Sequence, residues 1–124
     1  MTNSYKLASR INSDVNELVS YKSDLEQYDK PDYWVESGTF GDCEDYALLK
    51  RQRLLEAGFA RKDLHLACCW VETEAYHCVL LCNTSKGWFV LDNRYNWPMT
   101  PKSLPYRWDK ALDEVDGKWY ELSF

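Results

Sequence analysis

The sequence has no long apolar run, no excess of basic residues, and no repeat or low-complexity segment. Without an apolar run of about 18 residues, no segment is expected to cross a membrane. The 20 Asp and Glu residues outnumber the 15 Lys and Arg residues, so the formal net charge is −5. Because the acidic residues are interspersed among the basic ones, no basic stripe remains, and a generic nucleic-acid binder is not expected.

Two further features are missing: a Cys-x-x-Cys element and, at the start of the chain, a basic and apolar leader. Five cysteines are an odd number, which in a chain without a leader indicates reduced thiols rather than a disulfide framework. This pattern predicts a cytoplasmic protein, and a zinc site is not expected. Four of the cysteines are interpreted as core residues: Cys68, Cys69, Cys78 and Cys82.

The chain is predicted to form one domain, residues 1–124, with a substantial core, because 45% of its residues are hydrophobic. Its first predicted element is an amphipathic helix from about Ser4 to Tyr28. The apolar residues at helical spacing are Leu7, Ile11, Val15, Leu18 and Leu25. We expect this helix to cover a sheet or the second helix. A helix that binds a partner protein is the alternative.

The second predicted helix runs from about Cys43 to Ala57. Asp42 is a good N-cap residue, and Gly58 follows as a C-terminal stop. The apolar stripe of this helix is assigned to Ala47, Leu48, Leu54 and Leu55. The basic residues expected on its other faces are Lys50, Arg51 and Arg53. Cys43 therefore lies in the first turn.

A thiolate of Cys43 at the start of a helix would face unpaired backbone N–H groups, which lower the pKa of a thiol and could hold an oxyanion. Three neighbouring carboxylates oppose this effect, because like charges disfavour a thiolate: Asp42, Glu44 and Asp45. A protonated His77 or a bound cation would relieve the conflict. The alternative is that Cys43 is a small buried core residue.

A β-hairpin is predicted from the runs Tyr76–Cys82 and Gly87–Asp92, which flank a polar turn. If Cys82 pairs with Gly87, the numbers of facing residues sum to 169. His77 then faces Asp92, and the carboxylate could orient the imidazole as a general base and acid for a thiol. The alternatives are that His77 is a structural histidine of the strand and that Asp92 is a turn residue at the end of its strand. The other histidine, His65, has no acidic partner at matching parity and is assigned no role.

The chain resembles the bacterial transglutaminase-like cysteine peptidases, which include the LapG-type adhesin proteases. Three motifs carry the resemblance: Gly41-Asp42-Cys43-Glu44-Asp45-Tyr46-Ala47 with Lys50, His77-Cys78-Val79-Leu80, and Val90-Leu91-Asp92-Asn93. The likeness continues in Val15-Asn16, Tyr21, Asp32-Tyr33-Trp34 and the segment from Pro101 to Trp108. It covers nearly the whole chain.

The resemblance implies an α+β, papain-like fold in which the Cys43 helix packs on an antiparallel sheet. It also implies that a protein or peptide substrate is hydrolysed through an acyl-enzyme. Cys43 would be the nucleophile, His77 the general base and acid, and Asp92 the residue that orients His77. Trp34 would be a candidate oxyanion donor beside the backbone of Cys43, and the alternative is that it forms an aromatic lid packed on the core. The thiol chemistry requires no cofactor, but in LapG-type members the acidic flanks bind calcium, and the matching positions are Asp42 and Glu44.

The chain also departs from that family. LapG-type proteases are exported and longer, whereas this chain has no leader, and its segment Glu72–Ala75 is short, so its substrate is not inferred from theirs. A cytoplasmic or phage-encoded enzyme fits these departures. The alternatives are a catalytically idle structural subunit, with partner chains in a phage particle or other assembly, and an amidase or acyl transferase acting on peptidoglycan or glutamine side chains.

Overall fold

The computed structural model describes residues 3–29 and 40–124, and it describes side chains for residues 3–18 and 43–124. Two long helices come first: α1 (Ser4–Asp29) and α3 (Phe40–Glu56). The strands that follow are β1 (Leu64–Trp70), β2 (Tyr76–Thr84), β3 (Gly87–Leu91), β4 (Arg107–Asp113) and β5 (Lys118–Glu121). Short 3-10 turns precede β1 and β4, namely η1 (Arg61–Asp63) and η2 (Pro101–Ser103).

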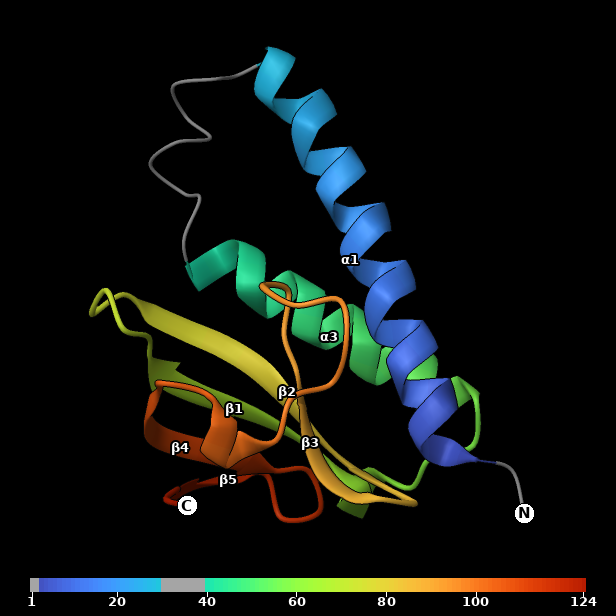
Figure 1. Ribbon diagram of the computed structural model, residues 1–124, viewed down its shortest axis with the longest axis vertical. Coiled ribbons are helices and arrows are strands. Elements are labelled where there is room, and N and C mark those ends of the chain that lie inside the picture. Colours follow the sequence, from blue (N-terminus) through green and yellow to red (C-terminus); the bar gives the residue numbers. More distant parts are fainter. Residues whose placement is uncertain (1–2, 30–39) are drawn as a thin grey trace.

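The five strands form one antiparallel sheet in the order β3-β2-β1-β4-β5. Both helices lie on the same side of this sheet (Figure 1). The predicted α+β class, with the cysteine-bearing helix packed on an antiparallel sheet, is confirmed. In the described part of the chain, no helix is both long and apolar enough to cross a membrane.

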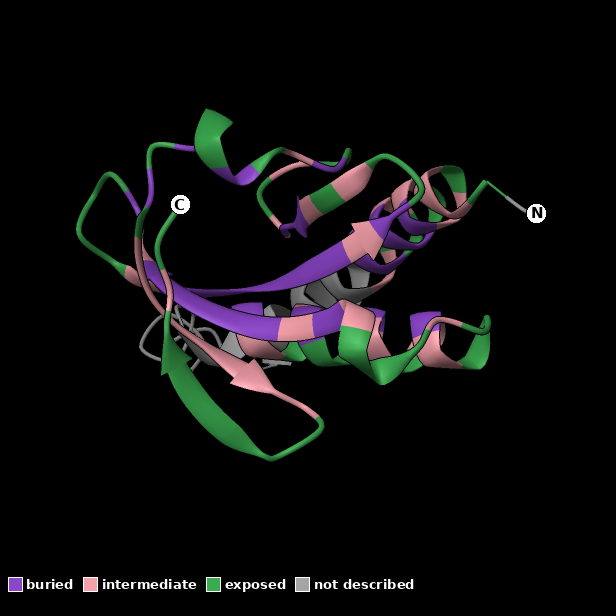
Figure 2. Cartoon of the chain, turned by 90° about the horizontal axis from the view of Figure 1, so that it is seen from below, coloured by how far each residue is buried: buried purple, intermediate pink, exposed green. Residues whose placement is uncertain are grey.

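The central strands β1 and β2 are buried on both faces of the sheet. One apolar cluster joins the two helices to the sheet and includes Val15, Ala47, Leu54 and Leu80. The other lies on the opposite face, where residues 95–106 pack against Val79 and Val90. Figure 2 shows the resulting pattern, with buried central strands and an exposed β5 at the edge. The four cysteines predicted to be core residues are all buried.

The start of α3 differs from the prediction. The helix begins at Phe40, so Asp42 lies inside its first turn and is not the N-cap. Cys43 is the fourth helical residue, which keeps it in the first turn as expected. The predicted stop at Gly58 is confirmed: φ is +107°, and Phe59 N–H donates to the carbonyl of Leu54 at 3.0 Å, which closes a Schellman motif.

Lys50 is the second correction in α3, because it lies in the buried stripe rather than on another face. Leu48, which was assigned to that stripe, is exposed. Spacing explains the difference. Residues 43, 47, 50 and 54 recur at intervals of four, three and four, and this spacing keeps them on one side of a helix.

The predicted hairpin is present, but its register is shifted by two residues. Thr84 pairs with Gly87, so the numbers of facing residues sum to 171 and the turn contains only residues 85 and 86. Leu81 therefore faces Val90, and His77 is not directly opposite Asp92. Strand β2 is longer than predicted and ends at Thr84. The Thr84 hydroxyl stabilises the turn, because it donates to the carbonyl of Gly87 and accepts from the N–H of Lys86. A shift of two residues preserves the face of every side chain.

A second hairpin joins β4 to β5. In it β4 ends at Asp113, and β5 covers Lys118–Glu121. Gly117 lies in the connecting turn with φ of +72°, a conformation that glycine adopts without strain. The first helix matches its prediction closely, with Ile11 and Val15 buried against the sheet and α3.

Candidate active site

Cys43 lies where the first turn of α3 meets the start of β2. Its Sγ accepts a hydrogen bond from the backbone N–H of Cys78 at 3.1 Å, which places the sulfur beside the residue that follows His77. The side chain of Cys43 is 2% exposed. The first turn of α3 therefore places the thiol at the start of β2, next to His77.

Burial raises the pKa of the Cys43 thiol to about 11. The backbone N–H groups of Cys78, Glu44 and Cys43 itself act in the opposite direction, and the negative charge of Asp92 raises the pKa further. The N–H groups of Glu44 and Cys43 have the effect expected at a helix start, and the N–H of Cys78 comes from β2, but desolvation exceeds their combined effect. At neutral pH the resting group is therefore a thiol, so a base must remove its proton for it to act as a nucleophile.

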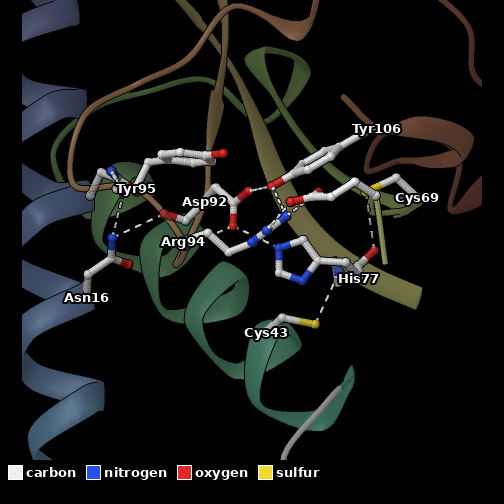
Figure 3. A network of polar contacts seen from close by, with 11 residues as sticks. Asn16, Cys43, Cys69, His77, Asp92, Arg94, Tyr95 and Tyr106 are labelled. Atoms are coloured by element: carbon white, nitrogen blue, oxygen red, sulfur yellow. Dashed lines mark hydrogen bonds and ion pairs between the residues drawn. The ribbon is translucent and has the colours of Figure 1, made fainter. Parts of the chain in front are cut away.

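His77 is bound directly to Asp92. Nε2 of the buried imidazole lies 2.7 Å from Oδ1 of Asp92. Figure 3 shows the ring between the Asp92 carboxylate and the Cys43 side chain. The two residues are not facing partners, but they lie on the same side of the hairpin, which is why the shifted register still brings them together.

Asp92 is completely buried and accepts several hydrogen bonds. Besides His77, its donors are the hydroxyl of Tyr106 and the backbone N–H of Arg94, the latter at 3.0 Å. Burial alone would raise the pKa of Asp92, but the hydrogen bonds and the charge of His77 outweigh it and lower the pKa. Asp92 is thus held as a carboxylate.

A chain of polar contacts continues from Asp92 to the surface. The guanidinium of Arg94 donates to the Tyr106 hydroxyl at 3.1 Å and forms a two-pronged ion pair with Glu72 at 3.0 and 2.6 Å. The ring of Tyr106 also meets the ring of His77 edge to face, with 6.0 Å between centroids. Tyr106 therefore contacts both members of the His77–Asp92 pair.

Helix α1 anchors the loop that follows β3. The side-chain amide of Asn16 donates to the carbonyls of Asp92 and Tyr95 at 3.1 and 2.8 Å, and Asn12 also donates to Tyr95. Both asparagines are buried between the apolar positions of the helix. Through these bonds α1 fixes the backbone that carries Asp92 (Figure 3).

The sequence indicated three of these residues and missed several others. Cys43, His77 and Asp92 come together, but Tyr106, Arg94 and Asn12 had no predicted role. For the backbone of Arg94 a signal existed: an Asp side chain often accepts a hydrogen bond from the N–H two residues later, which forms an Asx turn, and Arg94 follows Asp92 by two residues. For Tyr106 there was none, because its position depends on the path of a long loop.

The remaining predicted site residues are described only in part. Trp34 lies outside the described residues, and the side chain of Asp42 is not described either. Glu44 is half-buried. Within residues 3–18 and 43–124, no three His, Cys, Asp or Glu side chains are grouped as a metal site. Calcium usually takes six to eight oxygen ligands, so the described residues alone do not form such a site.

Comparisons with known proteins gave matches to a family model and to solved structures. A family model described as bacterial transglutaminase-like cysteine proteinase matches residues 1–123. Similar solved structures include Legionella pneumophila LapG in a calcium-bound form, with 19% identity and a TM-score of 0.57 over 64% of this chain and 45% of that one. An EGTA-treated form of the same protein has 18% identity and a TM-score of 0.58 over 67% of this chain and 46% of that one.

The likeness to LapG at this identity shows a shared fold, and the chain spans less than half of the LapG chain. A comparison with curated proteins gave no match. The family model, in contrast, covers all but the last residue. The chain belongs to the bacterial transglutaminase-like cysteine proteinase family.

Proposed function

We propose that residues 1–124 form one cysteine peptidase domain that hydrolyses a protein or peptide through an acyl-enzyme. Cys43 is the nucleophile, His77 the general base and acid, and Asp92 the residue that orients His77. The observation that carries this proposal is the 2.7 Å contact between His77 Nε2 and Asp92, made next to the Cys43 sulfur. A buried carboxylate on one ring nitrogen leaves the other nitrogen for the thiol.

The reaction follows from these positions. As the Cys43 sulfur attacks the substrate carbonyl, His77 takes the thiol proton, a C–S bond forms, and the carbonyl oxygen becomes an oxyanion. Collapse of this intermediate breaks the C–N bond, and His77 gives its proton to the leaving amine. Water then attacks the thioester with His77 as base, which releases the acid and restores the thiol. Asp92 stabilises the imidazolium that forms in each half of the cycle.

The oxyanion would be held by backbone N–H groups at the start of α3, including that of Cys43. The backbone N–H of Cys78 donates to the resting sulfur, and the N–H groups of Glu44 and Cys43 lower the pKa of the thiol, so backbone donors lie beside the attacking atom. Trp34 remains a predicted second donor.

Peptide cleavage tests the proposal directly. The chain is incubated with a mixed peptide library, and new peptide termini are identified by mass spectrometry. We expect cleavage by the wild type, none by Cys43→Ser, and undiminished cleavage by the matched Cys82→Ser variant, whose sulfur is buried in the core away from His77. Cleavage that persists in Cys43→Ser would contradict the assignment.

One observation favours a second candidate, a catalytically idle structural subunit. With 2% of its side chain exposed, Cys43 is reached by a substrate only after the site opens. If neither peptide cleavage nor selective alkylation of Cys43 occurs, this candidate replaces the peptidase. If Cys43 is alkylated selectively but peptides stay intact, acyl transfer or amide hydrolysis on peptidoglycan or glutamine becomes the better account.

Calcium binding stays a separate prediction, supported by the calcium-bound form of LapG. It would require Glu44 and Asp42 to be joined by further oxygen ligands, so no catalytic step is assigned to the ion. Isothermal titration with calcium chloride should give a binding signal for the wild type and a weaker one for Glu44→Gln. The exposed-residue variant Glu17→Gln is the control. No heat of binding for the wild type would contradict the prediction.

A further inference from the structure

Two buried cysteines outside the proposed triad face each other across neighbouring strands. Cys68 of β1 is paired with Cys78 of β2 in the antiparallel register, so their side chains point to the same face of the sheet. They are 2% and 3% exposed. Neither thiol takes part in the reaction proposed above, although the backbone N–H of Cys78 donates to the Cys43 sulfur. The two thiols are therefore available for chemistry of their own.

The two cysteines occupy the closer of the two kinds of site in an antiparallel ladder. The N–H of Val71 donates to the carbonyl of Ala75 at 2.9 Å, so these two residues form a hydrogen-bonded pair. Hydrogen-bonded and non-hydrogen-bonded pairs alternate, which makes Cys68 and Cys78, three positions earlier in β1, a non-hydrogen-bonded pair. The N–H of Cys78 agrees with this assignment, because it donates to the Cys43 sulfur rather than to β1.

This geometry suits a disulfide. At a non-hydrogen-bonded site the Cα atoms lie about 4.5 Å apart, and a disulfide requires a Cα separation of about 4.4 to 6.8 Å. Contact between the thiols is consistent with this: a hydrogen bond between them lowers the pKa of Cys68 and raises the pKa of Cys78. A bond between the sulfur atoms would therefore require little movement of either strand.

The nearest alternative pairings are less favourable. Cys69 follows Cys68 directly but lies on the opposite face of the sheet, where its thiol donates to the carbonyl of His77 at 3.8 Å. Cys82 lies four residues beyond Cys78 on the same strand, which corresponds to about 13 Å along the strand. The fold thus selects one pair from these four cysteines.

We propose that Cys68 and Cys78 form a modification site, at which a small peroxide oxidises the two thiols to a disulfide that a dithiol reduces again. One thiol attacks hydrogen peroxide, the O–O bond breaks, and the sulfur becomes a sulfenic acid as water leaves. The other thiol attacks this sulfur, an S–S bond forms, and a second water leaves. Two thiols and one peroxide give one disulfide and two waters. Because both sulfurs are buried, the site favours an oxidant of this size.

The disulfide would lie beside the Cys43 sulfur. It would fix β1 to β2 at the residue whose N–H donates to that sulfur and which directly follows His77. The inference goes beyond the proposed function and does not depend on it, since neither Cys43 nor a substrate takes part in the oxidation.

The test is peptide mapping of the folded wild-type chain after treatment with hydrogen peroxide. Chymotrypsin cuts after Trp70 and Tyr76, so the peptides that contain Cys68 and Cys78 stay joined only if a disulfide links them. We expect this joined species, located by fragmentation in the mass spectrometer, to be the main oxidation product and to disappear after dithiothreitol. A main product that links Cys43 to Cys78, sulfinic acid without a disulfide, or no oxidation of either thiol would overturn the proposal.

The neighbouring cysteine supplies a matched control. Cys68→Ala should abolish the joined species, whereas Cys69→Ala, the same change on the opposite face of β1, should retain it. Loss of the joined species in Cys69→Ala but not in Cys68→Ala would contradict the assignment. If either variant fails to fold, the wild-type map decides alone. The Cys43→Ser variant should also retain the disulfide, so this result is separate from the outcome of the peptide-cleavage experiment.

Oxidation in concentrated urea tests whether the fold selects the pair. In the unfolded chain the register of β1 and β2 is lost, so the five thiols should give a mixture of disulfides instead of one main product. If the bond between Cys68 and Cys78 were equally dominant in urea, their closeness in the sequence rather than the sheet would select them, and the proposal would be wrong.

Discussion

The two histidines of the chain lie on neighbouring strands but in different chemical surroundings. His77 in β2 contacts a buried carboxylate beside a thiol. His65 in β1 is hydrogen-bonded through Nδ1 to the backbone carbonyl of Leu112 at 3.0 Å and stacks on Trp88, with 5.4 Å between ring centroids. It lines an apolar groove of about 280 Å³, whose other walls include Tyr120 and Phe124.

The difference shows what makes a histidine a candidate base in this fold. Both rings are partly or fully buried and both have a polar partner. A backbone carbonyl fixes a ring without adding charge, whereas a carboxylate also stabilises the imidazolium. His77 has the carboxylate and the nearby nucleophile, whereas the ring nitrogen Nδ1 of His65 is hydrogen-bonded to a backbone carbonyl. Substitutions in and around the two histidines test this difference.

The largest effect should come from replacing each histidine by alanine. His77→Ala is expected to slow iodoacetamide alkylation of Cys43 at neutral pH by about 100-fold, because the group that takes the thiol proton is lost. His65→Ala should change the rate by less than about twofold. Mass spectrometry of the alkylated peptides gives both rates. Similar losses in the two variants would mean that His77 acts only through packing.

A smaller effect is expected from the hydroxyl of Tyr106. Tyr106→Phe keeps the ring against His77 but removes one hydrogen bond to Asp92, so the Cys43 alkylation rate should fall about fivefold, which corresponds to about 1 kcal/mol. Tyr76→Phe is the matched control, because the Tyr76 hydroxyl donates to Asp109 rather than to the site. If both tyrosine variants behave alike, the bond to Asp92 does not position the pair.

The smallest expected effect is on stability in acid. The pKa of Asp92 is lower in the folded chain than the value of about 3.9 in an unfolded one. Its contribution to stability is therefore fully present above about pH 4 and is lost as the pH falls through the folded-state pKa. Urea unfolding between pH 6 and pH 2.5 should show this loss in the wild type and a weaker one in Asp92→Asn. Equal pH dependence in both proteins would contradict the assignment.

The sequence predicted the architecture well because its strongest signals are periodic. The α1 stripe and the hairpin runs were assigned from apolar spacing, and their bounds were nearly correct. The register was wrong by two residues because turn chemistry at Thr84 extends β2. The prediction that His77 and Asp92 lie on the same face was still correct, because strand side chains alternate with a period of two and a shift of two residues leaves each side chain on its face.

Other parts of the site could not be predicted so easily. Lys50 was placed on a polar face because of its charge, although its spacing from Cys43 already put it on the same side of the helix. Tyr106 lies fourteen residues after Asp92, and its contact with the carboxylate depends on the fold of the intervening loop. Local propensity contains no information on such a contact.

The most direct test of the account is the relative reactivity of the five cysteines. Iodoacetamide at neutral pH, followed by mass spectrometry over time, should label Cys43 far faster than Cys68, Cys69, Cys78 and Cys82, although all five are buried. The reason is that only Cys43 is assigned a histidine that accepts its proton. Equal labelling rates for all five, or slower labelling of Cys43, would contradict the assignment of Cys43 and His77 as a reactive pair.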